Sequence, residues 1–383
     1  MKRTVLTLFF ILFICHITYS RNATTKNDSI FFEAVLNNDI ALVKKHLRQG
    51  FYVNTVYEKG LTVLMVAATE GHKSMVDLLL EHDANVNATF PSTSGTTALM
   101  LAAQSGHGDI VKLLLAKNAN VNTRNKHGVT ALIGAAKYGQ TAIIEALLAN
   151  GADLQLRDEE GGTALTTAVL HNHIDSIKML LAKGADINNI TNDGYTALMT
   201  AVVKRNTKTV RLLLVHGAEI NKRDKSGNTA LMYAVINGDT DTVQVLLDNG
   251  ADVNVTNKDG ITALMHAVLA NDFIIKTLIG HGADQNSSTE QGTTPLMFAA
   301  IQGLTASVQT LLANGAEIDR KDKNGNTALI HATVNNHIEE VKILLHNHAN
   351  INTTNKDGLT ALMLAKLAGY TSIIQLLEIA HNK

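Results

Sequence analysis

The sequence has little that would cross-link a protein, kink its helices or fill a thick core. Among 383 residues there are one cysteine, two prolines and no tryptophan, and aromatic residues make up only 4%. A single cysteine excludes an intramolecular disulfide, so stability must come from packing. Because large aromatic side chains contribute much of the buried area of most cores, a core of short aliphatic residues favours thin, regular layers over one thick globule.

An excess of charge is also missing. The chain has 33 basic and 34 acidic residues, which gives a formal net charge of -1. Removing Lys2 and Arg3, which we assign below to a cleaved segment, from the 33 basic residues leaves 31 against the same 34 acidic residues. Nucleic-acid-binding domains usually carry a clear basic excess. We therefore expect no nucleic-acid partner.

The first twenty residues are typical of a secretory signal peptide. Lys2 and Arg3 precede the mostly apolar residues 5–17, and a polar stretch follows. This layout predicts a signal peptide at residues 1–20 and a short polar linker at 21–27. The alternative is an uncleaved membrane anchor, although a span usually needs about 20 apolar residues. Both interpretations predict export through the secretory route to a periplasmic or secreted location, with a membrane contact only if the segment is retained.

A short phrase that begins with glycine recurs along the rest of the chain. It reads G-L-T-V-L-M, G-T-T-A-L-M and G-V-T-A-L-I in its first three copies. Successive copies start 32 to 35 residues apart, at Gly60, Gly95, Gly128, Gly161, Gly194, Gly227, Gly260, Gly292, Gly325 and Gly358. A period this strict indicates structural modules that stack on neighbours like themselves.

Residues 227–254 show how one repeat is expected to fold. Thr229 is a suitable N-cap for a first helix, because its hydroxyl can accept a hydrogen bond from a free amide of the first turn. Leu231, Ala234 and Val235 then follow at i, i+3 and i+4, which places them on one helical face. The pattern predicts a short amphipathic helix.

The same repeat predicts a second helix and the end of both. Gly238 is expected to end the first helix, because glycine enters left-handed backbone without a steric penalty. Asp239 or Thr240 can cap the second helix, which Gly250 ends. Helices this short are marginal in water. Stability must therefore come from stacking on the repeats before and after.

These residues resemble the ankyrin repeat. Residues 106–115 read G-H-G-D-I-V-K-L-L-L and residues 250–254 read G-A-D-V-N, both close to the pattern of that family. The resemblance covers residues 28–383 and implies an all-α ankyrin-repeat solenoid of about eleven helix-turn-helix repeats joined by short β-hairpin-like turns. Its first repeat opens with Ile30, Phe31 and Phe32 and is expected to be an amino-terminal cap. The predicted repeats lie near residues 28–59, 60–94, 95–127, 128–160, 161–193, 194–226, 227–259, 260–291, 292–324, 325–357 and 358–383.

The sequence departs from the family pattern in three places. The family motif T-P-L-H is mostly T-A-L-M, and only Pro295 fills the proline position. In the family the histidine ties neighbouring turns by hydrogen bonds, so we expect apolar packing in its place and some loss of rigidity. The turn at 87–95 has two extra residues, and we assign the missing residue of the 32-residue repeat to the turn at 285–292. Methionine occupies the histidine position at Met65, Met100, Met199, Met232, Met265, Met297 and Met363.

The resemblance implies a concave surface lined by turns and first helices. One position there, two residues after a recurrent alanine, is polar in three early repeats, as Thr69, Gln104 and Lys137, and aliphatic in seven later ones. We call the aliphatic set the ladder and hypothesise that it binds a peptide or a hydrophobic surface of a protein partner. The alternative is packing between neighbouring first helices. The ladder consists of Leu170, Val203, Ile236, Leu269, Ile301, Val334 and Leu367.

Catalytic and metal-binding patterns are absent from the sequence. There is no phosphate-binding glycine loop and no nucleophile elbow, so we predict no cofactor and no enzyme activity. His346 and His348 have no evident third ligand, so no metal site is predicted. We assign the other recurrent histidines to helix capping and helix-dipole contacts. They are His72, His107, His173 and His337 near second-helix starts, and His82, His216 and His281 near second-helix ends.

Two further patterns have simple interpretations. Mixed charges at the turn tips, such as those at 124–127, 157–160, 223–225 and 321–323, are expected to be solvated surface. Seven N-x-S/T sequons are interpreted as turn chemistry and not as glycan acceptors, although a eukaryotic secretory pathway could use them. They begin at Asn22, Asn27, Asn87, Asn189, Asn254, Asn286 and Asn352.

Three classes of function remain open at this point. The leading prediction is a monomeric, non-catalytic protein–protein interaction scaffold that works outside the cytoplasm. The second is a secreted microbial effector that acts on a host protein. The third is an enzyme. Its active site would have to lie on the repeats themselves, because repeat patterns continue to Leu376 and Leu377 and leave no separate catalytic domain.

Overall fold

The computed structural model describes residues 26–57, 60–90 and 95–381. The predicted signal peptide, residues 1–20, lies outside these described residues. The first described helix, α2 (Lys26–Leu36), begins inside the predicted linker 21–27. The chain divides into an amino-terminal unit, Met1–Asn192, and a carboxy-terminal unit, Asp193–Lys383. Each unit is described separately.

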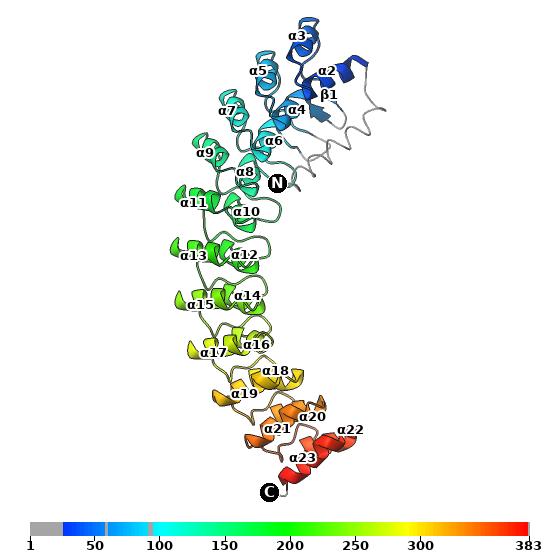
Figure 1. Ribbon diagram of the computed structural model, residues 1–383, viewed down its shortest axis with the longest axis vertical. Coiled ribbons are helices and arrows are strands. Elements are labelled where there is room, and N and C mark those ends of the chain that lie inside the picture. Colours follow the sequence, from blue (N-terminus) through cyan, green and yellow to red (C-terminus); the bar gives the residue numbers. More distant parts are fainter. Residues whose placement is uncertain (1–25, 58–59, 91–94, 382–383) are drawn as a thin grey trace. The chain divides into compact units, whose positions relative to one another are not determined.

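The amino-terminal unit contains five helix pairs, and in each pair a first helix is followed by a second helix. Its first helices are α2 (Lys26–Leu36), α4 (Val63–Glu70), α6 (Ala98–Ser105), α8 (Ala131–Lys137) and α10 (Ala164–Leu170). Its second helices are α3 (Ile40–Arg48), α5 (Lys73–Glu81), α7 (Gly108–Ala116), α9 (Thr141–Ala149) and α11 (Ile174–Ala182). Figure 1 shows the two kinds of helix in two adjacent rows.

The carboxy-terminal unit contains six helix pairs of the same kind. Its first helices are α12 (Ala197–Val203), α14 (Ala230–Ile236), α16 (Ala263–Ala267), α18 (Pro295–Gln302), α20 (Ala328–Val334) and α22 (Ala361–Ala368). Its second helices are α13 (Thr207–Val215), α15 (Thr240–Asp248), α17 (Asp272–Gly280), α19 (Thr305–Ala313), α21 (Ile338–His346) and α23 (Thr371–His381). Eleven helix pairs across the described residues confirm the predicted all-α fold.

The turns between repeats have the character of short β-hairpins. In the amino-terminal unit β1 (Val56–Tyr57) pairs antiparallel with β2 (Leu61–Thr62). Isolated antiparallel bridges join Phe90 to Thr96, Thr256 to Thr262 and Thr354 to Thr360. The hairpin-like turns implied by the sequence pattern are confirmed.

Threonine N-caps begin every first helix except α2. Thr229 Oγ1 accepts the Met232 amide, as the sequence predicted. Replacing such a cap usually costs about 1 kcal/mol of stability. The need for a cap in each of ten repeats explains why threonine recurs in the repeated phrase. The caps are Thr62, Thr97, Thr130, Thr163, Thr196, Thr229, Thr262, Thr294, Thr327 and Thr360.

The core consists of one thin layer per repeat. In the repeat at 227–259, Leu231, Met232 and Val235 on α14 are buried, as are Val243 and Leu246 on α15. Burying such a side chain contributes about 1.5–3 kcal/mol. The methionines at the family's histidine position are buried in all but the last repeat, which confirms apolar packing there.

Hydrogen bonds still link adjacent repeats without the family histidine. At the turn tips the Lys258 amide donates to the Ser226 carbonyl at 2.9 Å, and the Lys323 amide donates to Gln291 at 2.8 Å. A side-chain link runs in parallel, in which Asn254 Nδ2 donates to the Gly282 carbonyl at 3.0 Å. The turns are therefore connected from repeat to repeat by main-chain and amide groups that do not depend on residue 65 or its equivalents.

The predicted capping role of the histidines at second-helix starts is wrong. In the described residues none of their rings caps its own helix. His107 Nε2 instead donates to the Thr69 carbonyl of the preceding repeat at 2.9 Å, and His337 Nε2 donates to Ile301 at 3.0 Å. The His107 ring lies over Gly71, where an added Cβ would be 2.6 Å from its Cε1. These histidines connect repeats.

Two of the three histidines predicted to lie at second-helix ends bind a carbonyl of their own last turn, as expected. His216 Nδ1 donates to the Leu212 carbonyl at 2.8 Å, and His281 Nδ1 donates to the Thr277 carbonyl at 2.8 Å. Each ring adds a second hydrogen bond to a carbonyl that also accepts the backbone amide of the same histidine.

The missing residue of the repeat at 260–291 is not in the turn at 285–292, so that prediction is also wrong. Gly282 and Gly292 flank this turn with the same spacing as Gly250 and Gly260 in the repeat before. The shortening lies between the two helices. There α16 has only 5 residues, and its second helix begins at an extended Asn271 with φ -168°. The deletion therefore shortens the first helix, and the inter-repeat turn keeps its length.

Candidate binding surface

The ladder residues lie within two residues of the ends of the first helices. Val203, Ile236 and Val334 are the last residues of α12, α14 and α20. Six of its seven side chains are between 41% and 76% exposed, and Ile301 is half-buried. These side chains are therefore not enclosed between neighbouring first helices. Leu170 belongs to the amino-terminal unit, and the other six rungs belong to the carboxy-terminal unit.

A second row of side chains lies beside the ladder in the carboxy-terminal unit. It occupies the position three residues earlier, which shares a helical face with the ladder. Four of its six members carry a hydroxyl or an imidazole, and all are half-buried. The sequence analysis missed this row, although i, i+3 spacing on one helix would have identified it. The row consists of Thr200, Tyr233, His266, Phe298, His331 and Leu364.

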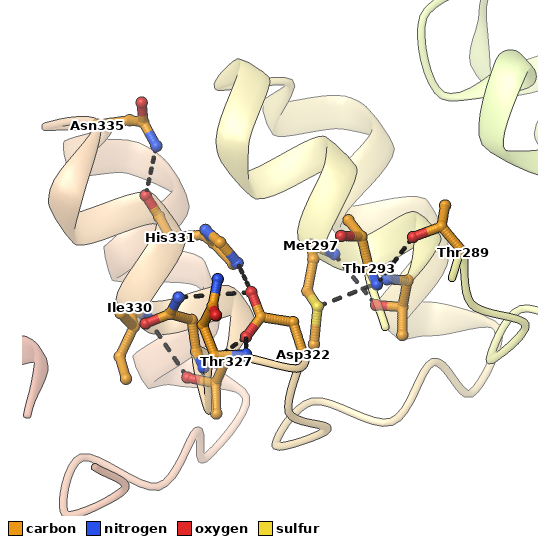
Figure 2. A network of polar contacts seen from close by, with 11 residues as sticks. Thr289, Thr293, Met297, Asp322, Thr327, Ile330, His331 and Asn335 are labelled. Carbon is orange, nitrogen blue, oxygen red and sulfur yellow. Dashed lines mark hydrogen bonds and ion pairs between the residues drawn. The ribbon is translucent and has the colours of Figure 1, made fainter. Parts of the chain in front are cut away.

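His331 is held by a carboxylate from the preceding turn (Figure 2). Its Nε2 donates to Asp322 Oδ2 at 2.9 Å, while the other oxygen of Asp322 accepts the Asn324 and Asn326 amides at 2.8 Å. Burial works to raise the pKa of Asp322, but the Asn326 amide, the His331 ring and the Asn324 amide together hold this pKa below its usual value. The pair fixes the imidazole next to Val334.

Tyr233 is held in the same way. Its hydroxyl donates to the carboxylate of Asp224, and the Tyr195 hydroxyl oxygen lies 2.9 Å from that of Tyr233. Burial, followed by the hydrogen bonds to Asp224 and Tyr195, raises the pKa of Tyr233 above its ordinary value. The phenol is therefore neutral and rigidly placed one helical turn before Ile236.

His266 differs from both, because its turn has an amide at the position where theirs have a carboxylate. Asn257 stands where Asp224 and Asp322 stand, and its amide donates to Asn228 Oδ1 at 3.0 Å. Within the described residues His266 Nε2 is buried without a hydrogen-bond partner. Burial lowers the pKa of His266. A neutral imidazole beside Leu269 follows from this environment.

Several turn-tip cations are structural contacts and not simply solvated charge, contrary to the expectation for these tips. Arg124 Nη2 donates to the Arg157 carbonyl of the next repeat at 2.7 Å. In the carboxy-terminal unit Arg223 Nη2 donates to the Thr256 carbonyl at 2.6 Å, and Lys321 follows the same pattern. A side chain of this length reaches the next turn because repeats stack closely.

The sequon asparagines are also structural where the structure describes their side chains in contacts. Asn87 Nδ2 donates to Asn118 at 3.2 Å, and Asn254 makes the equivalent bond. Asn189 is buried, with its amide directed to the Gly161 carbonyl. These contacts support the turn interpretation. Asn22 lies outside the described residues.

No group of three or more potential metal ligands gathers in the part of the chain that the structure describes. Among the same residues, no helix has the length and apolar character needed to cross a bilayer. The exposed face of the first helices, which carries the ladder and the row beside it, is therefore the candidate binding surface.

Comparison with known proteins agrees with the geometry. A family model described as ankyrin repeats (3 copies) matches residues 31–125, 118–191, 187–257, 231–322 and 306–382. A search of the curated proteins finds no match. The matched segments together cover almost the whole chain, and they coincide with the paired helices, threonine caps and hairpin-like turns described above. The chain therefore belongs to the ankyrin-repeat family.

Proposed function

We propose that this protein is a non-catalytic scaffold that binds a protein partner through the first-helix face of its carboxy-terminal unit. The observation that supports this most directly is the ladder, in which aliphatic side chains stay exposed at the same place in successive repeats. Single exposed apolar residues are normal, but a contiguous row of them is typical of an interaction surface.

The row beside the ladder supports the proposal independently. Asp224 holds Tyr233, and Asp322 holds His331, so these rings lose little conformational freedom when a partner binds. Preorganised aromatic and polar groups next to apolar contacts are the usual composition of binding hot spots. The face thus combines apolar area with fixed hydrogen-bonding groups.

Photo-crosslinking tests where the partner binds. A photoreactive residue is placed at Ile236 and, in a separate protein, at Val215, which is 83% exposed on the second helix α13. We expect the first position to capture a specific protein and the second to capture none. Mass spectrometry identifies the captured protein.

A matched pair of variants then tests the affinity for that protein. The double variant Ile236→Ser/Leu269→Ser removes two ladder residues, and the control Val215→Ser/Phe273→Ser removes two apolar residues of second helices that are more exposed than these. We expect the ladder variant to bind at least about tenfold more weakly, which corresponds to about 1.4 kcal/mol, and the control to bind normally. Equal losses in the two variants, or normal binding by the ladder variant, would overturn the proposal.

We further propose that the scaffold is a monomer exported through the secretory route, periplasmic or secreted. The charged start and apolar run of residues 1–20 support export. Amino-terminal sequencing of the protein recovered from the extracytoplasmic fraction tests this. A mature protein that begins near Arg21 supports the proposal, and an intact Met1 in cytoplasmic protein contradicts it.

A further inference from the structure

Four cations gather where the repeat at 194–226 passes from its first helix to its second. Lys204 and Arg205 lie in the turn after α12, and Lys208 and Arg211 follow on α13. All four are exposed. Across the described residues none of them forms an ion pair of 4 Å or less. We call these four residues the basic corner.

The basic corner departs from a charge rule that half of the other second helices follow. Negative side chains stabilise the first turn of a helix, because the amide dipoles there are positive. Second helices that obey the rule carry Asp109, Asp175, Asp241, Asp272 and Glu339 in the first turn. The first turn of α13 has no acidic residue and contains Lys208. This lysine weakens the helix that carries it.

Arg205 also occupies an unfavourable backbone conformation. Its φ is 57°, in the left-handed region that a side chain with a Cβ avoids. Gly238 fills the corresponding position of the next repeat with φ 65°, and nothing lies within 4 Å of where its Cβ would be. Other repeats place glycine or asparagine here. Residues that are unfavourable for folding and still present are expected at functional positions.

We propose that the basic corner binds an acidic, carboxylate-rich segment of the protein that occupies the ladder. This inference rests on the proposed function. The two surfaces adjoin in the sequence, because the ladder residue Val203 directly precedes Lys204. Arginine and lysine pair with carboxylates through charge-assisted hydrogen bonds. The partner's segment supplies the negative charge that the first turn of α13 lacks.

The rest of the chain favours an acidic protein over other polyanions. Nucleic-acid-binding domains are strongly basic overall, whereas this chain has a net charge of -1. The cations are also confined to one turn and one helix face, which suits a short peptide segment. Carboxylates, not phosphates, are therefore the assigned ligand.

A fluorescein-labelled peptide of ten glutamates serves as the probe, because it carries carboxylates and no apolar side chain. The test variant is Lys204→Gln/Arg205→Gly/Lys208→Gln/Arg211→Gln in the full chain. The control Lys258→Gln/Lys276→Gln/Lys323→Gln/Lys356→Gln removes the same number of charges from exposed lysines elsewhere in the carboxy-terminal unit. Affinity is measured by fluorescence anisotropy at low ionic strength and again at about 0.15 M, where surface charges are screened over about 8 Å.

We expect the test variant to lose at least about tenfold in peptide affinity and the control to lose less than about threefold. The single variant Arg205→Gly is expected to raise the melting temperature and still weaken binding, which a purely structural arginine would not do. The ladder variant Ile236→Ser/Leu269→Ser should bind the peptide normally, so a failure of the ladder is distinguished from a failure of the basic corner. The captured partner should also bind the test variant more weakly than the wild type.

Three results would overturn the inference. One is the absence of measurable peptide binding by the wild type at low ionic strength. Another is an equal loss of affinity in the test variant and in the control. The third is tighter binding of duplex DNA or of vesicles containing phosphatidylserine than of the peptide, lost in the test variant, because this would assign the surface to a different class of ligand.

Discussion

The two units of the chain share a repeat but differ in the surface of their first helices. In the amino-terminal unit the ladder position is Leu36 in the first repeat, polar in the next three, as Thr69, Gln104 and Lys137, and Leu170 in the fifth. In the carboxy-terminal unit it is aliphatic in every repeat. Both units nevertheless form the same helix pairs with the same threonine caps. The fold therefore does not depend on this position, which leaves it available for recognition.

The neighbouring position, three residues earlier, differs in the same way. Gly134 and Thr167 in the amino-terminal unit are buried, whereas Tyr233, Phe298 and His331 in the carboxy-terminal unit are half-buried and larger. Among the described residues, turn carboxylates hold side chains at this position in the second unit alone. The proposed binding groups thus lie where turn carboxylates fix them outside the core.

The largest expected effect tests whether the two units have cores of the same kind. Leu132→Ala and Leu231→Ala remove equivalent leucines that are both buried. Each should lower stability by about 2–5 kcal/mol, because a cavity is left in a thin layer. Native-state hydrogen exchange reports the loss locally, with the strongest effect expected in the unit that carries the change. A loss confined to the other unit would contradict the comparison.

A smaller difference in stability is expected between alanine substitutions at two glycines that have the same backbone conformation. Gly139→Ala and Gly238→Ala both introduce a Cβ at positive φ, which costs about 1–2 kcal/mol. At Gly139 that Cβ would also lie 2.5 Å from His173 Nδ1, whereas at Gly238 it meets nothing within 4 Å. Displacing His173 breaks its bond to the Lys137 carbonyl, so Gly139→Ala should cost about 0.5–1.5 kcal/mol more.

The control for this pair is the change His173→Ala. In a background that already lacks the ring, Gly139→Ala should cost only as much as Gly238→Ala in urea denaturation. If the difference persists in that background, the contact between glycine and histidine does not couple the repeats.

A pH-dependent effect of about 1–3 kcal/mol is expected from Asp322, whose carboxylate accepts bonds from two amides and from His331. Because the folded pKa of Asp322 is lowered, its contribution is fully present above the unfolded pKa of about 3.9 and is lost as pH falls through the folded value. Asp322→Asn should be less stable than wild type at pH 7 and equal to it at low pH. A constant difference across this range would contradict the assignment.

The smallest effect on stability is expected at the ladder position. Ile236→Ser in one unit and Lys137→Ser in the other should each change the free energy of unfolding by about 1 kcal/mol or less, because both side chains are exposed. Thermal denaturation measures this directly. A loss comparable with that of Leu231→Ala would show that the ladder belongs to the core and would remove the basis of the comparison.

Much of the fold was predictable because the rules that produce it are local. The Thr229 cap acts on an amide three residues away, and Leu231, Ala234 and Val235 share a face through helical spacing alone. The candidate surface was predicted only in part. The ladder residues were identified by their repeat position, but Tyr233 and His331 were missed because their partners lie in the preceding turn.

The sequence by itself determined the period, the helix pairs and their caps, since each follows from residues within about one helical turn or from simple repetition. Only the tertiary structure decided what contacts what between repeats. The histidine of one repeat donates to a carbonyl about 36 residues earlier. The missing residue that the sequence analysis assigned to a turn instead shortens α16. Such contacts depend on the stacking register of neighbouring layers, which local patterns do not encode.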